Sequence, residues 1–91
     1  MAANDTDTTY GHLDQLGELI AITAAETVRY VQEGGDTADL DAASTDIVDR
    51  VMDRPDAAGF VDTFSLGTVL DLVDATARRF LRADILASVA A

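Results

Sequence analysis

The chain has 91 residues, a formal net charge of −11 at pH 7 and no cysteine. This length predicts a single domain, and the absence of cysteine excludes disulfide bridges and thiolate metal sites. A small domain buries only about 60–65% of the surface that its unfolded chain exposes. Because self-association is a common way for such a domain to enlarge its hydrophobic core, we expect an oligomer.

The composition is strongly acidic and yet hydrophobic. The chain contains fourteen Asp, three Glu, six Arg and no Lys, while 48% of its residues are hydrophobic, which argues against disorder. This composition resembles that of cytoplasmic proteins from extreme halophiles, whose cells hold molar salt. At about 1 M salt the Debye length is only about 3 Å, so surface carboxylates scarcely repel one another and keep a protein soluble. The resemblance implies that the acidity is an adaptation to the solvent; the alternatives are an acidic mimic and a partner-binding surface.

No targeting or membrane-spanning segment is recognisable. Residues 1–9 are polar and acidic, and they lack the basic and apolar regions of a signal peptide. The uncharged apolar runs, such as Leu19–Ala25, are far shorter than the roughly 20 residues that span a bilayer. We therefore expect a disordered acidic leader over residues 1–9, one helical domain over residues 10–91, and a cytoplasmic location without a membrane partner.

The first predicted helix covers residues 11–33, and the Gly-Gly pair that follows is typical of a helix end. Apolar residues at three- and four-residue spacing mark one face of this helix: Leu13, Leu16, Ile20, Ala24, Val28 and Val31. Leu19, Ile22 and Tyr30 fall outside that row. They widen the apolar surface beyond one face, so we assign them to a partner.

The second predicted helix begins at Asp36 or Thr37, because either side chain can cap it. It ends at Arg54, since Pro55 disfavours helix in the residue before it. Its apolar stripe consists of Leu40, Ala43, Ile47, Val48, Val51 and Met52. Its polar face consists of Asp39, Asp46, Asp49, Arg50 and Asp53. This separation predicts an amphipathic helix that packs on one side.

The segment 55–59 is the one clear helix breaker, and bulky residues follow it. Phe60 and Phe64 predict a short connection that inserts against the bundle. The last predicted helix covers residues 64–89, and Ser65 is a candidate cap for it.

This last helix is apolar on more than one side. Its main stripe consists of Leu66, Val69, Leu70, Val73, Ala77, Phe80 and Leu81. Leu72 and Ile85 lie off that stripe. Such a pattern is typical of a helix that is central to a bundle or shared with another subunit.

Candidate catalytic and metal-binding residues do not form a recognisable pattern. His12 is the only histidine, and the sequence marks no nucleophile or acid beside it. The acids Asp36, Asp39, Asp41 and Asp46 cluster but fail the spacing of a calcium-binding EF-hand loop. No Glu is followed by the His that a di-iron bundle requires. We expect no enzymatic activity, no metal and no cofactor.

The arginines Arg78, Arg79 and Arg82 hold half of the positive charge within five residues. They can pair with neighbouring acids, or they can bind a phosphate or an acidic ligand through bidentate hydrogen bonds. The second helix, the 55–59 turn and the last helix can also be interpreted as a helix-turn-helix. With the arginines, this interpretation weakly indicates binding to nucleic acid. Asp71 and Asp74 on the would-be recognition helix oppose that reading, because they repel phosphates.

The predicted fold is all-α, a small up-down bundle of three main helices and a short fourth that pairs into a dimer. The predicted function is a non-enzymatic interaction module, acting as adaptor, subunit or regulator through self-association and protein binding. The alternative is a small dimeric helix-turn-helix-like transcriptional regulator that uses the arginine cluster; no small-molecule ligand is expected. The residues predicted to contact a partner are Leu19, Ile22, Tyr30, Phe60, Phe64, Leu72, Arg78, Arg79, Arg82 and Ile85.

Overall fold

A computed structural model describes the backbone of residues 2–90 and the side chains of residues 13–83. Four α-helices and no strand occur within residues 2–90, which confirms the all-α prediction. The helices are α1 (Ala2–Gln32), α2 (Leu40–Met52), α3 (Ala57–Phe64) and α4 (Leu66–Ala90). Helix α3 is the short fourth element that the sequence predicted.

Helix α1 begins earlier than predicted. Its backbone is helical from Ala2, so residues 2–9 are helical although they belong to the segment predicted as a disordered leader. That prediction relied on the polar and acidic composition of residues 1–9. The side chain of His12 lies outside the described residues. At its other end α1 stops at Gln32, close to the predicted position, and Gly34 adopts the left-handed conformation (φ 85°) typical of a helix C-terminus.

Helix α2 begins at a different cap from the two that the sequence proposed. The Asp39 carboxylate accepts a hydrogen bond from the Ala42 N–H (3.1 Å) and caps the helix. The Asp36 carboxylate instead accepts from the Ala38 N–H (2.9 Å) in the preceding turn. Three acceptors of similar quality precede this helix, so the sequence alone did not select among them. Helix α2 ends at Met52, slightly before the predicted end at Arg54.

The core is built on one row of α4. Val69, Val73, Ala77 and Leu81 follow one another at four-residue spacing and are fully buried. The remaining residues of the core cluster are Ala43, Ile47 and Val51 of α2, Leu19 and Tyr30 of α1, and Phe60 of α3. The apolar stripes predicted for α2 and α4 therefore supply most of the core, although Leu66, at the start of the α4 stripe, is exposed.

Helix α3 is joined to α4 by Ser65 alone. Ser65 has a φ of 81°, a region that non-glycine residues rarely adopt and that costs about 1–3 kcal/mol. Its hydroxyl oxygen accepts from the Thr68 N–H (3.4 Å), in agreement with its predicted role as the cap of the last helix. Phe60 of α3 is buried against the other helices, where the sequence predicted an inserted connection.

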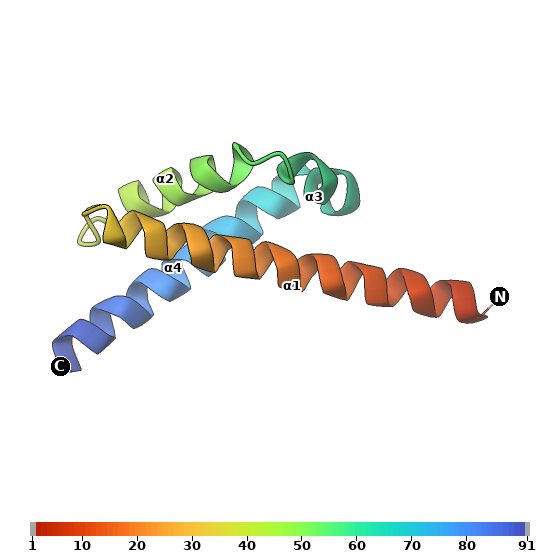
Figure 1. The fold of residues 1–91 in the computed structure, drawn as a ribbon, viewed down its shortest axis with the longest axis horizontal. Helices are drawn as coiled ribbons and strands as arrows, with labels where there is room; N and C mark the ends of the chain where they lie inside the picture. The colour runs from red at the N-terminus through yellow and green to blue at the C-terminus, as the bar shows by residue number, and fades with distance from the viewer. Residues whose placement is uncertain (1, 91) are drawn as a thin grey trace.

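The molecule is elongated. Its principal extents are 52 × 27 × 18 Å, and its radius of gyration is 14.9 Å, whereas a compact domain of this length has about 12 Å. Figure 1 shows that α1 and α4 cross, and that the N-terminal part of α1 and the C-terminal part of α4 extend away from the other helices. Because the long helices cross, each covers only part of the other, which leaves much of their surfaces outside the core.

Candidate interaction surface

Three residues that the sequence assigned to a partner lie inside the chain's own core. Leu19 is 1% exposed, Phe60 is 4% exposed and Tyr30 is 6% exposed. Within this fold these side chains are not part of the surface. Ile22, Phe64 and Leu72 are half-buried and pack against the core from its edge. The side chain of Ile85 lies outside the described residues.

Exposed large apolar residues lie instead on another face of α1, which carries most of the main periodic row although not Leu16. We call the α1 stripe the row of small and apolar residues Leu13, Gly17, Ile20, Ala24, Val28 and Val31. Leu13 and Val28 are more than half exposed, and Ile20 is 39% exposed. Ala24 and Val31 are half-buried at the edge of the bundle. An apolar row of this length along one helix, next to the buried face, is typical of a contact surface.

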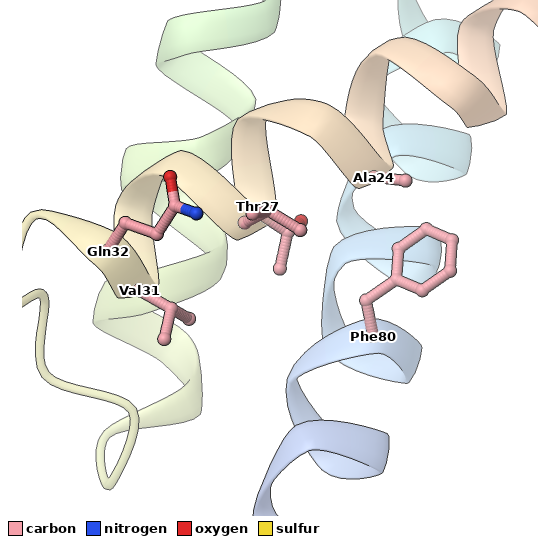
Figure 2. Close-up of a pocket in the computed structure, with 6 residues that line it drawn as sticks. Ala24, Thr27, Val31, Gln32 and Phe80 are labelled. Atoms are coloured by element: carbon pink, nitrogen blue, oxygen red, sulfur yellow. The ribbon is translucent and has the colours of Figure 1, made fainter.

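An apolar groove lies beside the α1 stripe, where α1 and α4 diverge. It has a volume of about 300 Å³ and is lined by Ala24, Thr27, Val28, Val31, Gln32 and Phe80. Figure 2 shows the Phe80 ring extending from α4 toward the part of α1 that carries Ala24. The groove continues the apolar surface of α1 onto α4, so both long helices contribute to it.

Two buried threonines explain why the core face of α1 is not its most apolar face. The Thr23 hydroxyl donates to the Leu19 carbonyl oxygen (2.8 Å), and the Thr27 hydroxyl donates to the Thr23 carbonyl oxygen (2.7 Å). Each hydroxyl is therefore satisfied within the helix and adds little cost to burial. A threonine bonded in this way presents its methyl group to the neighbouring helices.

A buried glutamate completes that face. Among the described side chains, Glu26 is the one buried acid. Its Oε1 accepts from Arg54 Nη1 (3.2 Å), which joins α1 to the end of α2, and from Arg29 Nη1 (3.4 Å). Nothing in the sequence predicts this role for Glu26, because a charged residue on a helix is normally exposed. Its pairing with a distant arginine is a tertiary contact that no local spacing indicates.

Tyr30 fixes the end of α1 against the start of α2. Its hydroxyl donates to the Asp36 carbonyl oxygen (2.7 Å), and the Arg50 guanidinium lies 5.6 Å from the ring centre. Arg50 also pairs with Glu33 and with Asp46. Burial, and next the nearby Asp46 carboxylate, raise the pKa of the Tyr30 phenol above its ordinary value. Tyr30 is therefore a structural residue of the helix junction.

The arginine cluster is divided between two environments. Arg78 pairs with Asp74 on its own helix (3.1 Å) and with Asp41 of α2 (2.7 Å), so it joins α4 to α2. These hydrogen-bonded carboxylates raise the pKa of Arg78 further above its ordinary value. Arg79 and Arg82 are exposed, and neither has an ion-pair partner among the described side chains.

The aspartates that suggested a calcium site have structural roles. Asp36 and Asp39 accept backbone hydrogen bonds before α2, while Asp41 pairs with Arg78 and Asp46 with Arg50. Within the described residues, no three His, Cys, Asp or Glu side chains are placed to hold a metal ion. In the same part of the chain, every helix is too short or too polar to cross a membrane.

A scan against protein-family models, a search of curated proteins and a search of solved structures each found no match to this chain.

Proposed function

We propose that the chain is a non-enzymatic helical interaction module that associates with a second copy of itself through the α1 stripe and the adjoining groove. The observation that carries this proposal is the exposure of Leu13, Ile20 and Val28 along one side of one helix. Burying such side chains in a subunit contact contributes roughly 25 cal/mol per Å² of apolar surface. A dimer provides that burial without requiring another protein.

The charge distribution supports a salt-rich cytoplasm as the setting. Glu26 aside, the acidic side chains of residues 13–83 are not buried, so the net charge of −11 is carried largely at the surface. Two such surfaces repel each other in dilute buffer, and salt removes most of that repulsion. Self-association through an apolar face is therefore expected to strengthen as salt rises.

The test is the molar mass of variants, measured by light scattering after size exclusion in about 1 M KCl. The double variant Ile20→Gln/Val28→Gln keeps helix-forming side chains but makes the α1 stripe polar, and we expect it to be monomeric. Leu66→Gln is the matched control, because Leu66 is equally exposed (52%, as is Val28) but lies at the start of α4. The control should keep the mass of the parent. Equal masses for all three proteins would contradict the proposal.

A second candidate function is a small dimeric transcriptional regulator, and it is favoured by Arg79 and Arg82, which are exposed and have no ion-pair partner among the side chains of residues 13–83. Asp71 opposes it, because this exposed acid lies on the same helix and repels phosphates. Replacing Arg79 and Arg82 with Gln should abolish retention on DNA while leaving Arg78, which joins α4 to α2, in place. If the parent does not bind DNA in high salt, or if the variant binds equally well, this function is excluded.

A further inference from the structure

We infer that two copies of the chain pair through their α1 helices in antiparallel orientation, with Ile20 of one copy opposite Ala24 of the second copy. The inference rests on the proposed self-association and adds the element, the direction and the register of the contact. The second copy is the occupant because the α1 stripe is complementary to itself when its direction is reversed.

Size complementarity sets the register. Reversing α1 about residue 22 places Leu13 opposite Val31 and Ile20 opposite Ala24, so the central pair of the stripe joins a large residue to a small one. Val28 lies opposite Leu16 and one residue from Gly17, where an added Cβ would have open space, so Gly17 leaves room beside the valine. Small residues opposite large ones let two helices approach closely and interdigitate. A parallel pair would place Ile20 against Ile20 and Gly17 against Gly17, which leaves bulges and gaps.

The charges along α1 favour the antiparallel direction. Asp14, Glu18 and Arg29 share one flank of the stripe, because they are four and eleven residues apart. The two acids lie in the N-terminal half, while Arg29, with 64% of its side chain exposed, lies near the C-terminus. Antiparallel pairing places the acids of one copy toward Arg29 of the other. Parallel pairing would place acid opposite acid, and it would also align the two helix dipoles unfavourably.

The groove beside the stripe fits the same arrangement. Ala24 and Val28 line it from α1, and Phe80 lines it from α4. With Ile20 of the second copy opposite Ala24, an isoleucine side chain lies at the mouth of this apolar groove. By two-fold symmetry, each copy then supplies one isoleucine to the other copy's groove.

Disulfide trapping tests the register directly, because the parent has no cysteine. Gly17→Cys and Val28→Cys are prepared as separate single variants, mixed in high KCl and oxidised. A disulfide needs Cα atoms about 4.4–6.8 Å apart, and antiparallel pairing brings position 17 of one copy near position 28 of the other. Two cysteines at position 17 in such a pair lie roughly 16 Å apart along the helix and cannot join.

We expect the mixed sample to yield a cross-linked heterodimer, identified by mass spectrometry, at several times the yield of either variant alone. Ala42→Cys mixed with Gly17→Cys gives the background, since Ala42 is exposed on α2. Efficient cross-linking of each variant alone would show parallel pairing and overturn the inference. A dimeric mass with only background cross-linking would also overturn it, while leaving self-association intact. A monomeric mass for the parent would refute both.

Discussion

At the residue scale, single side chains on α1 decide which of its faces turns inward. Thr23 and Thr27 are buried at little cost because their hydroxyls bond to the helix itself, and Glu26 is buried because Arg54 reaches it. The face with Thr23, Thr27 and Glu26 is therefore packed into the core, while the face with Ile20 and Val28 is exposed. Two measurements at individual residues follow from this assignment.

Glu26→Gln should lower the free energy of unfolding by about 1 kcal/mol, because it removes the charge from a buried carboxylate that pairs with two arginines. The partial exposure of Arg54 keeps the expected loss moderate, since water can solvate the arginine that remains. Urea unfolding in high KCl measures the change. Asp71→Asn is the control, because it removes the same charge from an exposed position and should change stability by less than about 0.5 kcal/mol.

Tyr30 predicts a loss of stability at alkaline pH. Burial raises its pKa in the folded protein, whereas the unfolded chain releases the proton near pH 10.0. The folded state therefore holds the proton more tightly, and the resulting stabilisation is complete below pH 10 and is lost as the pH rises through the folded pKa. Tyr30→Phe should remove this dependence of the free energy of unfolding on alkaline pH. At neutral pH the same substitution should cost about 1 kcal/mol, because it removes the hydrogen bond to the Asp36 carbonyl oxygen. Tyr10, the other tyrosine of the chain, provides the control: Tyr10→Phe should keep the loss of stability at alkaline pH. If Tyr10→Phe removed that loss and Tyr30→Phe did not, the assignment of the effect to Tyr30 would be wrong.

At the scale of the elements, periodicity predicted where the helices lie but not how α1 is rotated. The stripes of α2 and α4 matched the core, since each of these helices buries most of the apolar row that the spacing marks, with Leu66 of α4 as an exception. On α1 two apolar rows compete, and the row containing Leu19 and Tyr30 is the buried one. The sequence could not decide between them, because the choice depends on threonine self-bonding and on the Glu26–Arg54 contact between distant segments.

The helix starts and the position of the candidate surface could not be predicted from the sequence alone either. The cap of α2 was misplaced because several polar residues there satisfy the same local rule, whereas the start of α1 was misplaced because its polar, acidic first residues were interpreted as a leader. The sequence predicted that the long helices carry apolar residues on more sides than one chain can bury. The location of the exposed apolar surface on Ile20 and Val28 required the structure, since exposure is set by which helices cross over which residues.

Adjacent substitutions on α1 test its orientation. Leu19→Ala should cost roughly 2–4 kcal/mol, because Leu19 is fully buried and leaves a cavity. Ile20→Ala should cost under about 1 kcal/mol in the monomer, because Ile20 is well exposed and alanine favours helix. Denaturant unfolding at protein concentrations low enough to suppress association measures both. The reverse order of the two losses would mean that α1 packs by its other face.

At the scale of the whole molecule, charge and apolar surface act against each other. The net charge of −11 on an elongated body only 18 Å thick repels a second copy and also strains the fold itself. The Debye length falls from about 30 Å at 0.01 M salt to about 3 Å at 1 M, so salt relieves both effects. We predict that the free energy of unfolding, measured in urea, rises steadily with KCl. A stability independent of KCl would contradict the proposed adaptation to salt.

The most direct test of self-association is the molar mass of the parent chain, measured by light scattering in molar KCl and in dilute buffer. The account predicts a dimer in high salt that dissociates or unfolds when salt is removed. A stable monomer under both conditions would contradict it, and the α1 stripe would then be a surface for a different protein.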